Sequence, residues 1–273
     1  MIDVKRDFDE RVSQIEKYLL WVWISDKKSI VNDLSDIAES KIILEDESEI
    51  KLSDYLINGA TFRMDSELLK IMKSNTILLF YNLVEGTINS IMNEFIGTIN
   101  RERTKFKELE NPIKKIWLRY KHKSFGIGEK KSDDYILLAL ETIIEEIIEI
   151  TPKEIRDSEL GTRIISDYDA YSAETRPNEI SGNLDTRKIK ELFSLYGLPN
   201  ITISCDSLLK VKNKRNSLAH GNETFAQVGS SFTIEDLYKM KVEICKFLSH
   251  LLTETEEYLD NKRYKIANAQ PHL

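Results

Sequence analysis

Apolar residues recur at steps of three and four along most of the chain, the spacing that places side chains on one face of an α-helix. The first such stripe predicts a helix over about residues 4–25 that packs one face on a core. Its apolar positions are Phe8, Val12, Ile15, Leu19 and Val22, and Trp21 and Trp23 widen it.

A second, longer helix is predicted over about residues 66–99. Its middle is apolar on most sides, and a helix that is apolar all round is normally buried. We therefore expect this segment to be the long central helix of a bundle.

Residues 185–262 supply the remaining helices of the predicted bundle. One begins at Asp185 and ends at Gly197, because glycine commonly follows the last turn of a helix. Another covers about residues 206–220, and the last begins at Thr233 with the residue spacing of a capping box.

We predict that residues 100–182 form an insertion, with a basic helical part and an irregular loop. Its first part, residues 100–131, holds eleven Lys or Arg against four Glu, with four aromatic residues among them. Such a pattern can bind nucleic acid, but the solvated face of an amphipathic helix produces it too, and we favour the helix. A further helix is expected over residues 132–150, and residues 151–184 lack periodicity. Residues 264–273 are expected to form a loose tail.

The composition supports an all-α fold in one domain over residues 1–273. Ten glycines and five prolines are less than half of average usage, too few for the turns of a sandwich or barrel. Cys205 and Cys245 form no CxxC pair, no apolar run is long enough to cross a membrane, and the first residues lack a signal peptide's apolar run. These features predict a cytoplasmic protein without membrane contact.

Most catalytic motifs of known spacing are absent from the sequence. It holds no P-loop, no GxSxG and no HExxH, and its four histidines share no metal-ligand spacing. Asp167 and Asp169 near Glu174 could hold Mg²⁺, although a polar loop is the favoured interpretation. The sequence therefore predicts neither a metal site nor a cofactor. Its net charge of −7 also means that any nucleic acid must bind at a local basic patch.

One predicted helix carries an arginine in its apolar stripe. Arg215 follows Leu208 and Val211 and precedes Leu218 at helical spacing. A buried guanidinium needs a carboxylate, a phosphate or water as its partner. Glu85 on the predicted central helix is one candidate, so an Arg215–Glu85 brace is the structural alternative to a catalytic role.

His220 lies five residues after Arg215, and Asn213 and Asn216 share a helix face with this histidine. Gly221 follows, where a left-handed residue often ends a helix. A permanent cation, an imidazole and two amides near one helix end are suited to cleaving a phosphodiester without a metal. The imidazole can move protons, and the cation can stabilise charge that develops on the phosphate.

The stretch RNSLAHG, residues 215–221, resembles the Arg-x4-His motif of the HEPN superfamily of helical-bundle proteins, including the polar residue directly after the arginine. The stretches ILLFYNLVEGTINS and SGNLDTRKIKELFSLYGLPN are also similar to a bacterial HEPN branch associated with defence and toxin systems. The resemblance covers about residues 66–99 and 181–260 and implies an all-α HEPN-like bundle.

This resemblance implies a metal-independent endoribonuclease. The 2′-hydroxyl would attack the phosphate and leave a 2′,3′-cyclic phosphate and a 5′-hydroxyl. Arg215 would stabilise the phosphate, His220 would move protons, and Asn216 would orient or polarise the reacting groups. The paired motifs of a homodimer would form one composite site. The residues expected to bind the RNA, for which tRNA is a candidate, are Lys212, Lys214 and Asn213.

The same resemblance implies a role in phage defence or in a toxin–antitoxin system, with an antitoxin or defence protein as partner. HEPN toxins that a nucleotidyltransferase silences carry a tyrosine two places after the histidine. Asn222 occupies that place here, so control by tyrosine modification is not expected.

Two other functions remain open. The second hypothesis is a non-catalytic HEPN-type module for dimerisation or partner binding, in which Glu85 braces Arg215 and His220 only caps its helix, since the fold alone does not decide activity. The third is a DNA-directed enzyme that uses the basic residues 100–131, and it lacks the metal ligands of a nuclease.

Overall fold

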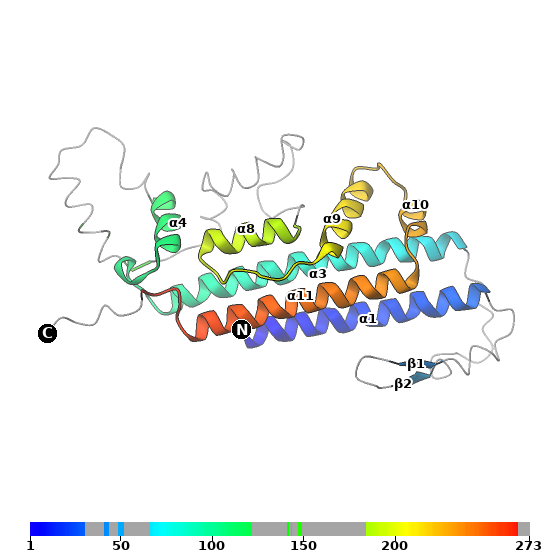
Figure 1. Cartoon of the computed structure of the whole chain (residues 1–273), viewed down its shortest axis with the longest axis horizontal. Helices are drawn as coiled ribbons and strands as arrows, with labels where there is room; N and C mark the ends of the chain where they lie inside the picture. The colour runs from blue at the N-terminus through cyan, green and yellow to red at the C-terminus, as the bar shows by residue number, and fades with distance from the viewer. Residues whose placement is uncertain are drawn as a thin grey trace. The chain divides into compact units, whose positions relative to one another are not determined.

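The computed structural model of the chain describes residues 1–30, 41–43, 49–51, 66–121, 141, 143, 147, 148 and 184–266 (Figure 1). The chain divides into two compact units. The first contains residues 1–6, 84–206 and 246–273, and the second contains residues 7–83 and 207–245. The single domain over residues 1–273 therefore stays a prediction.

Helices dominate the described residues, which confirms the predicted all-α class. Two strands of three residues each also pair antiparallel, with Ile42 opposite Ile50, and the sequence pattern did not predict them. The elements are α1 (Ile2–Ile30), β1 (Lys41–Ile43), β2 (Glu49–Lys51), α3 (Ser66–Arg101), the short 3-10 helix η2 (Phe106–Glu108), α4 (Asn111–Lys121), α8 (Thr186–Tyr196), α9 (Asp206–Ala219), α10 (Phe225–Ser230) and α11 (Ile234–Asp260).

The core of the second unit joins α1, α3 and α11. Val22, Leu69 and Ile234 are buried together, one from each of these helices. The hydroxyl of Tyr18 on α1 donates a hydrogen bond of 3.1 Å to the carbonyl of Met72 on α3. Burial of these apolar side chains, rather than helix propensity, holds such helices together.

Most of the first predicted stripe is buried, and Trp23 packs against the core beside it, but the prediction for Trp21 is wrong. Phe8, Ile15, Leu19 and Val22 are buried and Val12 is half-buried. The side chain of Trp21 is 49% exposed, because each residue turns about 100° around the helix from the one before it. The neighbour of a fully buried residue can therefore face water.

The predicted helix ends are confirmed where capping residues mark them. Asp185 accepts a hydrogen bond of 3.0 Å from the amide of Lys188 at the start of α8, and Gly197 ends that helix with φ +67°. At the start of α11, the amide of Thr233 donates to Asp236 and the amide of Asp236 donates to the Thr233 hydroxyl, at 2.9 and 3.0 Å. This reciprocal pair is a capping box.

The last described residues belong to the fold of the first unit, which corrects the prediction of a loose tail from residue 264. Tyr264 is fully buried, and its carbonyl accepts a hydrogen bond of 2.9 Å from the amide of Glu110. Ile266 donates through its amide to the carbonyl of Glu108, also at 2.9 Å. The polar composition of this segment gave no indication of these tertiary hydrogen bonds. Residues 267–273 lie outside the described residues.

Glu102 in the first unit carries a strongly shifted pKa. Lys262 and Lys265 form ion pairs of 3.0 and 2.7 Å with Glu102. Burial alone would raise the pKa of Glu102, but hydrogen bonds, led by the one from Lys265, outweigh it and lower the pKa to about 2. This carboxylate therefore stays charged through mildly acidic pH.

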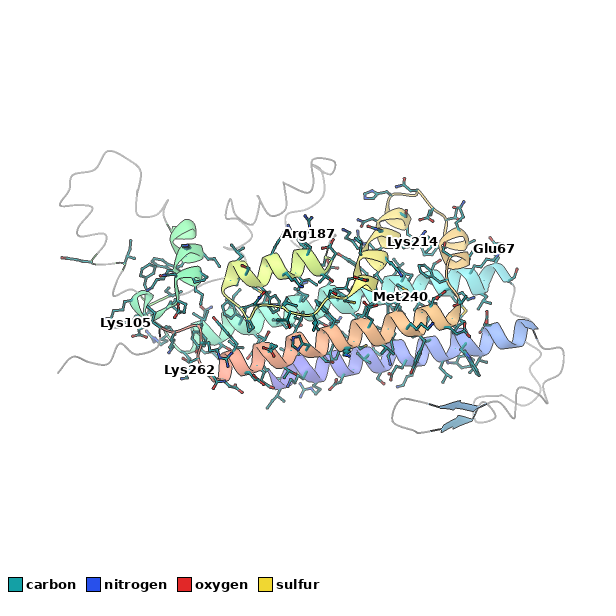
Figure 2. All side chains as sticks on the ribbon, in the orientation of Figure 1. Glu67, Lys105, Arg187, Lys214, Met240 and Lys262 are labelled. Atoms are coloured by element: carbon teal, nitrogen blue, oxygen red, sulfur yellow. The ribbon has the colours of Figure 1, made fainter. Side chains whose placement is uncertain are left out.

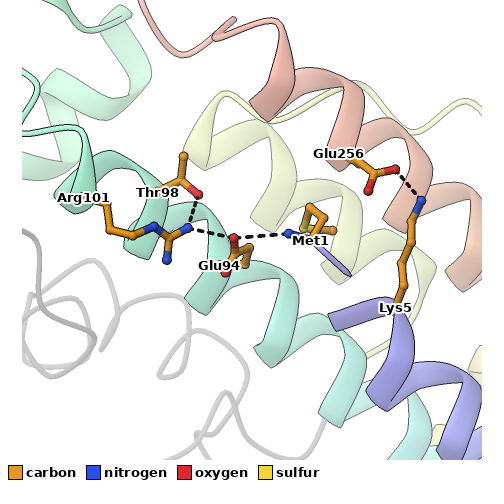
Figure 3. A network of polar contacts seen from close by, with 6 residues as sticks. All are labelled: Met1, Lys5, Glu94, Thr98, Arg101 and Glu256. Atoms are coloured by element: carbon orange, nitrogen blue, oxygen red, sulfur yellow. Dashed lines mark hydrogen bonds and ion pairs between the residues drawn. The ribbon is translucent and has the colours of Figure 1, made fainter. Parts of the chain in front are cut away.

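The start of α1 is tied to α3 and α11 by a polar network within the first unit (Figure 3). The amino group of Met1 contacts Glu94 at 3.3 Å, and Arg101 reaches the same carboxylate at 2.8 Å. Lys5 pairs with Glu256 on α11. Aromatic contacts add to this unit's core, where the ring of Phe95 meets that of Tyr196 edge-on at 6.1 Å.

Only part of the predicted insertion can be compared. Residues 111–121 form α4, as the amphipathic interpretation of the basic segment expects. The helix predicted to residue 150 is wrong at its end, because Ile147 pairs with Lys105 as an antiparallel bridge and the amide of Ile148 donates to the carbonyl of Thr104 at 3.0 Å. Most of residues 122–183 lies outside the described residues.

Candidate functional site

The candidate site lies on α9 in the second unit, and the first turn of this helix is firmly anchored. The hydroxyl of Ser207 donates to the carboxylate of Glu243 on α11, and the Ser207 amide donates to the same carboxylate at 3.4 Å. A negative charge at a helix N-terminus is favourable, since the first amides lack partners within the helix. Leu208 and Val211 are each 1% exposed and complete the anchor.

Arg215 is half-buried one turn further along α9. Its guanidinium carbon lies 5.0 Å from the ring centre of Tyr81 on α3, and the ring is itself buried. The Nη1 group donates a hydrogen bond of 3.3 Å to the side-chain oxygen of Asn216. The aromatic face and the amide together restrict the guanidinium's position. A guanidinium has five N–H donors, so others can meet a phosphate.

The predicted brace between Arg215 and Glu85 stays a prediction. Glu85 is half-buried and belongs to the first unit, whereas Arg215 and Tyr81 belong to the second. The sequence pattern was right that Arg215 interrupts the apolar stripe, because Leu208 and Val211 are buried. The arginine itself is not fully enclosed.

His220 is exposed at the end of α9, and Gly221 next to it has φ +70°, as predicted. The amide of Gly221 donates to the carbonyl of Leu218 at 3.3 Å, and the amide of Asn222 donates to that of Ser217 at 2.9 Å. These two bonds form a Schellman motif, which satisfies carbonyls that the helix leaves without partners. The motif ends the helix sharply and presents the imidazole to solvent.

The predicted RNA-binding residues occupy the same half of α9. Lys212 is half-buried and Asn213 is exposed. Lys214, labelled in Figure 2, forms an ion pair of 2.7 Å with Glu223 in the turn that follows the helix. Hydrogen bonds from Lys214, which has the larger effect, and from Ser217 hold the pKa of the Glu223 carboxyl below its usual value.

A short helix that the sequence pattern did not predict closes this turn against α3. Helix α10 begins with a capping box formed by Thr224 and Gln227. A Cβ atom at Gly229 would lie 1.9 Å from the carbonyl oxygen of Lys70, so only glycine allows α10 to approach α3 this closely. The hydroxyl of Ser74 also bonds to the carbonyl of Phe225.

No three metal-binding side chains gather at one point among the described residues. The alternative magnesium ligands Asp167, Asp169 and Glu174 lie outside the described part of the chain. Within that part, no helix is both long and apolar enough to span a membrane.

A family model described as HEPN_MAE_28990-like HEPN matches residues 4–264. The chain belongs to this HEPN family. The match confirms the predicted membership of the HEPN superfamily, and HEPN domains are helical, often act as ribonucleases and often dimerise or bind RNA. No curated protein matches the chain, and neither does any solved structure.

Two further side chains of this HEPN protein contact the segment that bears the motif, and neither was predicted. Tyr81 supports Arg215 from another helix, and no local pattern reports such a tertiary contact. Glu223 lies near the motif in sequence and could have been found as the acidic residue that follows the helix stop at Gly221.

Proposed function

We propose that this HEPN protein is an endoribonuclease that needs no metal ion for cleavage. The observation that carries the proposal is the contact of Arg215 with Asn216 on the second half of α9, which the exposed His220 follows directly. A fixed cation and an accessible imidazole are the two groups that phosphodiester cleavage by a neighbouring hydroxyl requires.

In the proposed reaction, the 2′-hydroxyl oxygen of the RNA bonds to phosphorus and loses its proton. The bond from phosphorus to the 5′-oxygen breaks, and that oxygen gains a proton. Negative charge grows on the non-bridging oxygens, where Arg215 donates hydrogen bonds while Asn216 holds its guanidinium in position. The products are a 2′,3′-cyclic phosphate and a 5′-hydroxyl.

The reaction needs one group that accepts a proton and one that donates a proton. A single His220 cannot do both at the same moment, so two copies of the chain are proposed to contribute one imidazole each. The proposed active form is therefore a homodimer with one composite site on its two-fold axis.

RNA is the proposed substrate, and tRNA is a candidate. Lys212 and Lys214 would neutralise its phosphates, and Asn213 would bind it through hydrogen bonds. We further place the activity in phage defence or in a toxin–antitoxin system, with a partner protein that restrains it.

The test is cleavage of purified tRNA and total RNA in the presence of EDTA. We expect cleavage with 2′,3′-cyclic phosphate and 5′-hydroxyl ends, and a loss of at least about 100-fold in His220→Ala, because general acid–base catalysis contributes about 100-fold or more. His250→Ala removes an imidazole from a half-buried position on α11 and should cleave normally. Absence of cleavage, or equal cleavage by His220→Ala, would disprove the proposal.

The contact of Arg215 with the Tyr81 ring favours a second candidate function. If that contact serves stability alone, the protein is a non-catalytic module that dimerises or binds a partner. The two functions differ in what replacement of Arg215 does to the folded state, which gives the first prediction of the Discussion.

A further inference from the structure

The ion pair of Lys214 and Glu223 encloses the whole candidate motif. Arg215, Asn216 and His220 all lie between these two residues in the sequence. The 2.7 Å contact joins α9 to the turn beyond Gly221. This ion pair therefore links the two ends of the segment that bears the motif.

Glu223 holds this position through more than one bond. Its amide donates to the carbonyl of Ser217 at 3.4 Å, beside the bond from the Asn222 amide to the same oxygen. Hydrogen bonds from Lys214 and Ser217 lower the pKa of its carboxyl. The group is therefore ionised at neutral pH, and its negative charge faces Lys214.

The pair is also easy to open. The two side chains are 27% and 28% exposed, and ion pairs in contact with water are weak because solvent screens them. A carboxylate and a phosphate offer a lysine the same kind of anionic oxygen. Lys214 adjoins Arg215, the proposed ligand of the phosphate that is cleaved.

We propose that Glu223 is an internal substitute for an RNA phosphate, which occupies Lys214 in the free protein and is displaced from it when RNA binds. This inference rests on the proposed function, because it assumes that RNA is the ligand of this helix end. It assigns Glu223 a role in tuning affinity, since every bound strand must first replace the carboxylate.

The displacement predicts an unusual dependence on salt. A lysine that binds a phosphate normally releases about one counterion, which gives a single-stranded RNA a slope of about −0.7 in log affinity against log salt per contact. Salt also weakens the ion pair with Glu223 that must open, and this opposes the loss of RNA affinity, so the contact at Lys214 should give a slope shallower than about −0.7. Replacement of Glu223 by Gln should steepen the slope toward the full value of about −0.7 for this contact.

The experiment measures the binding of a fluorescent 12-nucleotide RNA by anisotropy at several salt concentrations. All variants carry His220→Ala, so that the probe stays intact. We expect Glu223→Gln to lower the Kd about threefold at low salt, the scale of an exposed ion pair, and to steepen the slope. In a Lys214→Gln background the same change should alter neither quantity. Lys214→Gln should make the slope shallower by a larger amount with Gln at position 223 than with Glu.

Glu235→Gln is the matched control, because it removes one negative charge from the exposed first turn of α11. The inference is wrong if Glu223→Gln tightens binding equally with Gln at position 214, if Glu235→Gln has the same effect, or if no variant binds the RNA. Circular dichroism of each variant verifies its fold, and Glu223→Ala, which removes the same charge, takes the place of Glu223→Gln should that variant unfold. RNA that binds in this way but is never cut by the unmodified chain would remove the proposed function and leave the role of Glu223 intact.

Discussion

Arg215 makes a structural contact in the fold and is also the proposed ligand of the phosphate. Its guanidinium rests on the buried ring of Tyr81, and it is only half-buried itself. A cation over an aromatic ring at a partly exposed site contributes about 0.5–1 kcal/mol, whereas loss of one partner from a buried ion pair costs about 3–5 kcal/mol. The free energy of unfolding therefore separates the two proposed roles.

We expect Arg215→Ala to lower the free energy of unfolding by about 1 kcal/mol or less and to abolish RNA cleavage. Urea unfolding and the cleavage assay in EDTA measure the two effects. Tyr81→Leu is the companion variant, which removes the aromatic face but keeps the guanidinium, and it should reduce cleavage less than Arg215→Ala does. A loss of about 3 kcal/mol or more in Arg215→Ala would instead favour the brace with Glu85 and the non-catalytic module.

At this scale, local spacing predicted the backbone of the site better than its contacts. The left-handed Gly221 and the buried neighbours of Arg215 could be read from adjacent residues, because both depend on the helix alone. Tyr81 could not, since its position under Arg215 depends on how α3 and α9 pack. The opposite error occurred at Trp21, whose apolar character says nothing about which side of the helix is covered.

Helix α10 is the element that holds the turn after the motif against α3. Its Gly229 lies so close to the carbonyl of Lys70 that a side chain cannot be accommodated without movement of backbone. The contact fixes where the chain returns from the exposed end of α9. The position of the turn therefore depends on the absence of a Cβ atom at Gly229.

Gly229→Ala should destabilise the second unit by about 2 kcal/mol, because overpacking against backbone forces the two helices apart. Gly97→Ala is the matched control within α3, since its Cβ would meet only the flexible end of Arg101 at 3.3 Å. Alanine is the better helix former, so the control should be neutral or more stable by up to about 1 kcal/mol. Urea unfolding compares the two variants, and equal midpoints would contradict the role assigned to Gly229.

Elements with long apolar stripes and capping residues were predictable from sequence, and short ones were not. Helices α8 and α11 begin at Asp185 and Thr233 as expected, because their caps act over three residues. Helix α10 and the strands β1 and β2 were not predicted, because they are too short to display a period. Ile147, which the pattern placed in a helix, instead forms a bridge with Lys105, a tertiary bond that periodicity cannot reveal.

The whole molecule carries a net charge of −7, yet its proposed substrate is a polyanion. Long-range attraction cannot supply the affinity, so local cations must do so, and the proposed function assigns this role to those on α9. In a homodimer, two such helix ends would contribute to one cleft, and the bound strand would offset the repulsion between them. Assembly and RNA binding should therefore support each other.

Mixed dimers test whether the site is shared. Arg215→Ala and His220→Ala should each be inactive as homodimers, since one lacks both guanidinium groups and the other both imidazoles. A heterodimer of wild-type and His220→Ala chains, purified through two different tags, holds one imidazole and should cleave RNA at least about 100-fold more slowly than the wild-type dimer, because the proposed reaction needs two imidazoles. Activity near half that of the wild-type dimer would show that each chain works alone, and wild-type chains mixed in the same way serve as the control.

Helix α9 is anchored unequally along its length. Ser207, Leu208 and Val211 are buried near its start, whereas none of residues 213–220 is buried. Backbone hydrogen bonds in a weakly packed helix end open at a small fraction of the global unfolding free energy, so amide hydrogen exchange should quicken from the first turn to the last. The side chains of the proposed site can then adapt to RNA strands of different shape while the rest of the bundle stays folded. This adaptability suits the proposed nuclease, which would recognise RNA by the geometry of one phosphodiester linkage rather than through a long complementary surface.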